Sequence, residues 1–226
     1  MKIIYKDKYI VVCEKACGEL SEGESDDSLT VKLPKVLEGS GEKNTQIFSV
    51  HRLDRETVGA IVFARDSKSA AALSQSIQTG SFSKEYLAVV HGVPDKKEDT
   101  LSDLLFYDRA RSKSFVVDKK RAGVKQASLE YCVLQTASLS DSPISLLKVK
   151  LFTGRTHQIR VQLASRRHPL LGDRRYGAPK DGVTSVALLS HALCFPHPKT
   201  NNILTFSVSA PDSFPWNVFG CLHIEE

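Results

Sequence analysis

The chain lacks a long apolar segment, and its start does not resemble a leader. It has 226 residues, of which 41% are hydrophobic, yet no apolar run approaches the roughly 20 residues that span a bilayer. Residues 1–7 place charges too close together for the apolar core of a signal peptide. These absences argue against a membrane protein. They predict a globular chain that stays in the cytoplasm and can bury a sizeable core.

Cysteines are few, and their number is odd. The five thiols are scattered among mostly apolar neighbours, at Cys13, Cys17, Cys132, Cys194 and Cys221. This pattern favours reduced, buried thiols over a disulfide framework. Cys13 and Cys17 could begin a metal site, but no paired Cys or His cluster completes it at a recognisable spacing. The combination of H-x-E with P-C-x-x-C that marks zinc deaminases is also absent. We therefore expect neither a metal nor a small-molecule cofactor.

Positive charge is concentrated in two segments. The net charge of +5 hides an acidic start, because residues 1–50 carry seven Lys and Arg against nine Asp and Glu. Residues 109–125 and residues 151–180 each hold seven basic side chains and one acidic side chain, a net charge of +6 per segment. A single run of this kind is usually only a solvated face. Two such runs favour a phosphate-rich partner, which points to nucleic acid.

Short apolar runs bounded by turn residues predict a sheet. Two strands are expected in the first fifteen residues, and others over residues 60–64, 84–90, 127–134, 145–151, 186–195 and 203–208. An acidic loop is expected over residues 19–28, and an extended hairpin or loop that carries charge outward over residues 109–125.

Two segments have the spacing of helices. The first begins after Asp66 or Ser67, presents Leu73 on its apolar face and ends at Gly80. The second begins near Thr156 and ends before residue 169, a proline. No internal repeat or low-complexity tract interrupts the chain, so we expect a single α+β domain dominated by a sheet.

Two dense polar clusters lie far apart in the sequence. They are residues 51–59, HRLDRETVG, and residues 153–160, TGRTHQIR. Each alone has an ordinary interpretation, because an Asp before T-x-G often closes a turn and an Arg-rich helix is often a solvated face. Together they suggest a carboxylate, Asp54, and an arginine, Arg155, that folding brings together.

The two clusters carry a resemblance to a known family. The chain resembles the RluA-type RNA pseudouridine synthases, whose signatures are H-R-L-D-x-x-T-x-G and G-R-x-H-Q-I-R. Three more segments occur in the order that this family has, at residues 83–92 (SKEYLAVVHG), 171–177 (LGDRRYG) and 190–198 (SHALCFPHP). The chain departs from the family at Ala16, where a proline is typical, at Val58, where Ser is common, and at Gln162, where His is frequent.

The resemblance implies a fold and an activity. The fold would be the α+β pseudouridine synthase fold, a mixed and largely antiparallel sheet in two halves with flanking helices and a central catalytic cleft. Residues 1–226 would form a single catalytic domain without a separate N-terminal S4-like domain. The activity would be isomerisation of specific uridines in rRNA or tRNA, with base flipping and no cofactor.

The resemblance also implies catalytic residues. Asp54 matches the catalytic aspartate, which acts as a nucleophile or a base. Arg155 would keep Asp54 ionised, or would act only as a phosphate clamp. Tyr86 would stack on the flipped uracil or move a proton, unless it is simply a core tyrosine.

Four further residues are candidate RNA contacts. Arg52 can stack and bind phosphate at once, so it suits the space left by a flipped base. Ile159 would line an apolar wall of the pocket, although a plain core role is nearly as well supported. His51 and Arg160 complete the set.

Two other interpretations remain open from the sequence alone. The chain could be a non-catalytic RNA-binding or RNA-folding protein on the same scaffold. A two-carboxylate glycosidase is remote, because Asp54 and Glu56 would point to opposite sides of a strand. The RNA target is unspecified, and the absence of heptad repeats favours a monomer.

Overall fold

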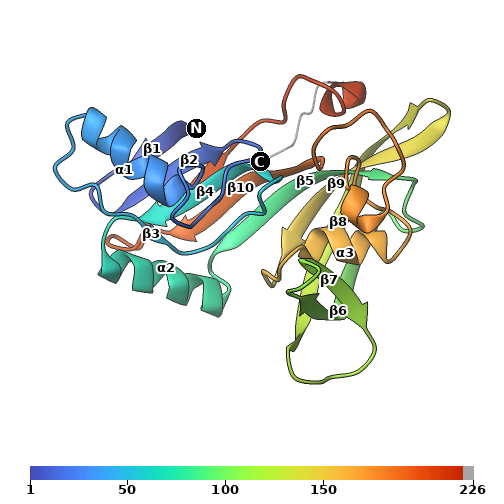
Figure 1. Ribbon diagram of the computed structural model, residues 1–226, viewed down its shortest axis with the longest axis horizontal. Helices are drawn as coiled ribbons and strands as arrows, with labels where there is room; N and C mark the ends of the chain where they lie inside the picture. The colour runs from blue at the N-terminus through green and yellow to red at the C-terminus, as the bar shows by residue number, and fades with distance from the viewer. Residues whose placement is uncertain (221–226) are drawn as a thin grey trace. The chain divides into compact units, whose positions relative to one another are not determined.

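The computed structural model describes residues 1–220 and divides the chain into two compact units (Figure 1). The first unit comprises Met1–Lys84 and Leu189–Val208, and the second comprises Glu85–Leu188 together with the described residues 209–220. Cys221 lies outside the described residues. No helix of the described part is long and apolar enough to cross a membrane.

The first unit is built on four successive neighbouring strands. They are β1 (Lys2–Lys6), β2 (Ile10–Lys15), β4 (Val58–Ala64) and β10 (Leu188–Pro196). β3 (Phe48–Ser49) also pairs with β4, and β11 (Ile203–Ser207) pairs with β10. Because β10 runs parallel to β4 while β2 runs antiparallel to it, the sheet is mixed. The apolar runs of β2 and β4 are almost entirely buried and form the core of this unit.

Two helices accompany these strands. α1 (Leu29–Gly39) buries three leucines at four-residue intervals, Leu29, Leu33 and Leu37. α2 (Ser67–Thr79) begins at Asp66, whose side chain accepts a hydrogen bond from the Ser69 amide, and it ends at Gly80 in the left-handed conformation (φ 79°). The sequence-based boundaries of α2 are therefore confirmed.

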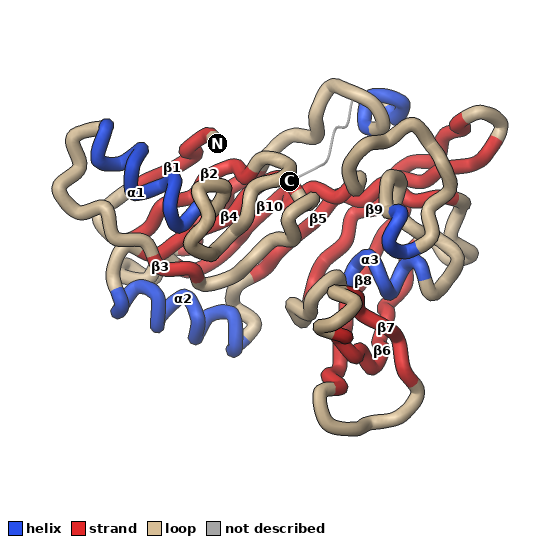
Figure 2. The backbone as a smooth tube through the Cα atoms, viewed as in Figure 1, coloured by secondary structure: helices blue, strands red, loops and turns tan. Residues whose placement is uncertain are grey.

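The second unit is an antiparallel set of five strands with the neighbour order β5, β9, β8, β6, β7. Its strands are β5 (Ser83–His91), β6 (Glu98–Asp108), β7 (Lys113–Val117), β8 (Val124–Leu139) and β9 (Ser142–Leu151). α3 (Gln158–Ala164) packs on β6, β7 and the short 3-10 helix η1 (Arg174–Tyr176). A second 3-10 helix, η2 (Trp216–Phe219), packs against β8. Strands outweigh helices in both units (Figure 2).

The expected fold class is confirmed, with differences of detail. The sheet is mixed and largely antiparallel, and every strand expected from the sequence is present. α1 and β6 were not expected, and α3 begins at Gln158 rather than near Thr156. Cys13 is buried, and burial raises the pKa of its thiol to about 12. Cys17 is exposed, which corrects the expectation that both thiols are buried. The single catalytic domain and the central cleft stay predictions.

Candidate active site

Asp54 lies on the loop between β3 and β4. Its side chain is half-buried, and its carbonyl oxygen accepts a hydrogen bond from the Thr57 amide at 3.0 Å, which closes a tight turn before β4 begins. The turn fulfils the ordinary expectation for an Asp before T-x-G, and it also presents the carboxylate at the end of a buried strand. The loop from Ser49 to Thr57 is called the Asp54 loop below.

Two residues of the segment after β2, Gly18 and Ser21, are hydrogen-bonded to the Asp54 loop. Ser21 Oγ accepts a hydrogen bond from the Leu53 amide and donates one to the Leu53 carbonyl, both at 2.9 Å. Gly18 donates its amide to the Arg55 carbonyl at 2.9 Å, and Arg55 Nε donates to the Gly18 carbonyl at 3.0 Å. Residues on both sides of Asp54 are therefore held in place.

Lys15 anchors the same loop through its side-chain ammonium. Its side chain is fully buried, and Nζ donates to the carbonyls of Ala16, Arg55 and Thr57 at 3.1, 2.9 and 2.7 Å. Burial lowers the pKa of this amine from 10.5 to about 8, although nearby acidic groups, Asp54 among them, oppose that shift. Lys15 therefore lies within electrostatic range of Asp54. Lys15 directly precedes Ala16, the position where the family typically has a proline, but the sequence gave no role for it.

Only a glycine fits the backbone at residue 59, near the start of β4. Its φ is +110°, and a Cβ atom there would lie 2.3 Å from the Ser190 carbonyl oxygen of β10. Ser190 Oγ donates to the Ala60 carbonyl at 2.8 Å, which fixes the same close approach. The glycine of the T-x-G pattern is therefore required by strand packing.

His51 and Arg52 flank the loop differently. His51 Nε2 accepts a hydrogen bond from the Val62 amide at 3.2 Å, and burial, together with Lys84, lowers the pKa of the imidazole to about 3. This inward orientation differs from the RNA contact expected of His51, and it gives the ring a structural place beneath the loop. Arg52 is exposed and pairs with Glu22 at 3.3 Å, so its guanidinium is accessible from solvent.

Tyr86 belongs to β5 of the second unit and is 5% exposed. It stands opposite Val149 in β9, whereas its neighbour Glu85 stands opposite Lys150. Because successive side chains of a strand alternate between faces, Tyr86 points away from the face that carries Glu85 and Lys150.

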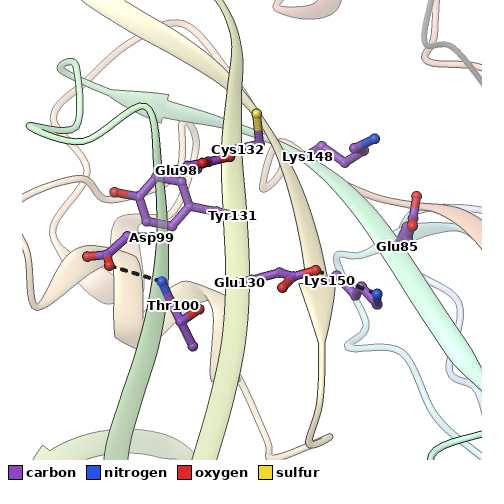
Figure 3. Close-up of a pocket in the computed structure, with 9 residues that line it drawn as sticks. All are labelled: Glu85, Glu98, Asp99, Thr100, Glu130, Tyr131, Cys132, Lys148 and Lys150. Atoms are coloured by element: carbon purple, nitrogen blue, oxygen red, sulfur yellow. Dashed lines mark hydrogen bonds and ion pairs between the residues drawn. The ribbon is translucent and has the colours of Figure 1, made fainter.

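That opposite face carries a charged hollow of about 540 Å³ (Figure 3). Four carboxylates line it, at Glu85, Glu98, Asp99 and Glu130, together with the two lysines Lys148 and Lys150. Lys150 Nζ lies 3.6 Å from a Glu130 oxygen. An excess of carboxylates repels a polyanion, so this hollow does not suit RNA.

Arg155 lies on the loop between β9 and α3, called the Arg155 loop (Phe152 to His157). Its side chain is exposed, and Nε donates to the Gln126 carbonyl of β8 at 3.0 Å. The buried Gln158 amide holds the loop. Its Oε1 accepts hydrogen bonds from the Arg155 amide at 3.0 Å and from Thr153 Oγ1 at 2.7 Å, while its Nε2 donates to the Ser128 carbonyl at 3.0 Å.

Arg160 and Ile159 lie in the buried part of α3. Arg160 Nε and Nη2 donate to the two carboxylate oxygens of Asp173 at 2.7 and 2.8 Å, and these residues are only 3% and 0% exposed. This buried ion pair corrects the expectation that Arg160 contacts RNA, because its charge is committed inside the protein. Ile159, which is 3% exposed, has the burial of a core residue.

The candidate residues are thus divided between the two units. His51, Arg52 and Asp54 share one loop of the first unit, and Tyr86, Arg155, Ile159 and Arg160 belong to the second. Sequence reasoning missed the residues that anchor the two loops, Lys15, Ser21 and Gln158. The only available signal for Lys15 and Gln158 was their place in family motifs.

Comparison with known proteins agrees with both motifs. The family described as RNA pseudouridylate synthase matches residues 9–165. The chain belongs to the RNA pseudouridine synthase family. Enzymes of this family are isomerases, and no redox step is needed to exchange a carbon–nitrogen for a carbon–carbon bond.

Two relatives of this synthase extend over most of its length. An uncharacterized RNA pseudouridine synthase of Aquifex aeolicus is 33% identical over 95% of the chain and 71% of its own length. The dual-specificity RNA pseudouridine synthase RluA of Escherichia coli is 32% identical over 92% of each protein. Among solved structures, human RNA pseudouridylate synthase domain containing 1 has a TM-score of 0.77 at 22% identity, over 93% of this chain and 83% of its own. This last likeness shows a shared fold.

Proposed function

We propose that this synthase uses Asp54 as its catalytic carboxylate, with Tyr86 and Arg155 as partners. The observation that supports the proposal best is the way in which the Asp54 loop is built. The carboxylate is half-buried, and the residues after it are held by hydrogen bonds from the buried Lys15 ammonium and between Arg55 and Gly18. Such an arrangement keeps an anion in one place in a partly dehydrated setting, which a nucleophile or base requires.

The reaction is a balanced isomerisation. The bond from N1 of uracil to C1′ of ribose breaks, the base turns, and C5 of uracil forms a new bond to C1′. The hydrogen at C5 leaves as a proton, and N1 gains a proton, so no oxidant or reductant takes part. Asp54 would either attack C1′ or take a proton from C2′, and both routes need the ionised carboxylate.

Arg155 and Tyr86 have complementary roles in the proposal. The guanidinium of Arg155 would favour the charged form of Asp54 and bind a nearby phosphate. The ring of Tyr86 would stack on the extruded uracil, and its hydroxyl is a candidate for moving the C5 proton. Arg52, exposed beside Asp54, would brace the space that the flipped base leaves.

The proposed substrate is a uridine in tRNA or rRNA, acted on by a monomer in the cytoplasm. The dual specificity of the Escherichia coli relative supports testing more than one RNA class. The basic turns on either side of β7 supply phosphate contacts through exposed side chains, among them Arg109, Arg111, Lys119 and Lys120. The four cysteines among residues 1–220 are free thiols, which favours a reducing compartment.

Tritium release tests the proposal. Total tRNA and total rRNA labelled as 5-³H-uridine lose tritium when C5 forms the new bond, and Asp54→Asn should slow this release by at least about a thousandfold. RNA binding and folding should be retained, because Asn has the shape of Asp. Release by Asp54→Asn at the wild-type rate would exclude the assignment. RNA binding with no release by the wild type would favour a binding protein on this scaffold.

A further inference from the structure

The hairpin formed by β6 and β7 is hydrogen-bonded to the Arg155 loop by one buried serine. Ser114, the second residue of β7, is 2% exposed. Its Oγ donates to the Thr156 carbonyl at 2.6 Å, and its amide donates to the Tyr176 hydroxyl at 2.8 Å. Thr156 directly follows Arg155, so this strand of the hairpin is fixed to the loop that carries the arginine.

Tyr176 closes the other side of the connection. Its hydroxyl lies 3.0 Å from His157 Nδ1, and the two rings meet edge to face with centroids 5.7 Å apart. His157 adopts a left-handed backbone conformation (φ 54°), which is uncommon for a residue other than glycine and costs free energy unless the surroundings hold it. Ser114 and Tyr176 together supply that support.

The group formed by Ser114, His157 and Tyr176, called the node below, is also connected to the basic turn of the hairpin. Arg175, the neighbour of Tyr176, donates from Nη1 to the carbonyls of Arg111 and Ser112 at 3.2 and 3.0 Å. Tyr176 and Val116 also pack against a buried cluster of Leu105, Ala127 and Val161. The turn that offers exposed arginines, Arg109 and Arg111, is therefore rigidly connected to α3 and to the loop before it.

We propose that Ser114 and Tyr176 are positioning residues, which couple the contact of RNA with the β6–β7 hairpin to the placement of Arg155. This inference rests on the function proposed above for Arg155 and adds a route by which substrate binding controls it. RNA phosphates at Arg109 and Arg111 hold the hairpin turn. Ser114 and Tyr176 carry this constraint to the Thr156–His157 turn, and Arg155 then takes its working position.

The first test needs no catalysis. Hydrogen exchange of the amides of residues 152–158, measured by mass spectrometry on the free protein, should be several-fold faster in Ser114→Ala and in Tyr176→Phe than in the wild type. Ser102→Ala is the matched control, because Ser102 is an exposed serine of the same hairpin whose hydroxyl accepts a hydrogen bond from the Gln126 side chain at 3.3 Å. Unchanged exchange in both variants would overturn the proposal, whatever the enzyme's activity.

The second test uses the rate at saturating RNA. Single-turnover tritium release from labelled total tRNA or rRNA should be roughly three- to tenfold slower in Ser114→Ala, while the dissociation constant for the same RNA stays within about twofold. Tyr176→Phe keeps the ring and the Ser114–Thr156 bond, so it provides a second variant if Ser114→Ala unfolds. A rate unchanged in both folded variants would contradict the coupling.

A double-mutant cycle isolates the route. Replacing Arg109 and Arg111 by Ala should weaken RNA binding in every background. In the wild-type background it should also lower the saturating rate, whereas in Ser114→Ala that second effect should largely disappear. Equal losses of saturating rate in both backgrounds would show that the hairpin acts independently of Ser114. If the wild type releases no tritium, the proposed function fails, but the exchange measurement still decides whether the node holds the loop.

Discussion

The Asp54 loop and the Arg155 loop are each held by one buried side chain that makes three hydrogen bonds, but the two anchors differ in charge. Lys15 donates to the carbonyls of Ala16, Arg55 and Thr57. Gln158 joins the Arg155 amide, the Thr153 hydroxyl and the Ser128 carbonyl. A charged anchor adds an electric field to the loop that carries the anion, and it can lose that field by titration. A neutral amide fixes geometry alone, independently of pH.

On α3, directly after the Arg155 loop, the charge of Arg160 is paired with Asp173 inside the protein. Of the predicted changes, removing Asp173 should lower the unfolding free energy most. Asp173→Asn removes the buried carboxylate that Nε and Nη2 of Arg160 both contact, which should lower the unfolding free energy by about 3–5 kcal/mol in urea denaturation. Asp99→Asn is the control, since its partner Lys96 is 66% exposed and the change should leave the unfolding free energy nearly the same. Similar losses in the two variants would show that burial does not distinguish the pairs.

Lys15 should give the two loops different pH dependences. Its folded pKa of about 8 lies below the ordinary value of 10.5, so the unfolded chain binds more protons between these two pH values. The unfolding free energy of the wild type should therefore rise with pH relative to Lys15→Met, by up to about 3 kcal/mol across that window. Activity should move in the opposite direction, falling above about pH 8 as the ammonium beside Asp54 is lost.

Urea denaturation and tritium release at a series of pH values check both parts of this prediction. Lys15→Met should be slow at every pH, and its activity should lack the alkaline decline that deprotonation of Lys15 causes. Parallel stability curves for Lys15→Met and the wild type would mean that Lys15 does not titrate in this window.

Gln158→Leu should have the smallest effect on stability and should leave the pH profile unchanged. The variant removes the acceptor of the Arg155 amide, whereas the Ser128 carbonyl keeps the amides of Phe152 and Thr153. The loss should cost about 1–3 kcal/mol of unfolding free energy and slow turnover by about tenfold. Gln126→Leu is the matched control, because only its main-chain carbonyl holds Arg155. A loss in Gln126→Leu as large as in Gln158→Leu would show that the buried amide is not the anchor.

Local signals in the sequence predicted much of the fold. Asp66 and Gly80 mark the two ends of α2 because a cap and a left-handed terminator act within a few residues. α1 escaped notice because Pro34 lies inside it and an acidic loop precedes it, although Leu29, Leu33 and Leu37 have helical spacing. β6 begins with Glu98 and Asp99, residue types that rarely start a strand, and it exists because it pairs with β8 along its length.

The site was predictable to the extent that its motifs are local. The tight turn at Asp54 and the exposed Arg155 follow from short patterns, whereas the burial of Arg160 depends on Asp173, which lies in a separate motif. Lys15 could not be assigned a role, because two of its three partners are the main-chain carbonyls of Arg55 and Thr57, which are distant in the sequence. Every residue has a main-chain carbonyl, so the sequence does not indicate which ones a lysine will bind. At Gln162, where the family often has His, the amide Nε2 donates to Asp103 at 2.6 Å, so the departure retains a polar partner on β6.

The burial of His51 bears on how the activity of this synthase should respond to acid. A histidine three residues from the proposed catalytic carboxylate, Asp54, would ordinarily be expected to cause an inflection in the mildly acidic range. With a pKa of about 3, its imidazole stays neutral there and serves the Val62 amide. Protonation of His51 therefore does not account for an acidic limb of the rate profile, and this imidazole supports the loop as a neutral hydrogen-bond acceptor.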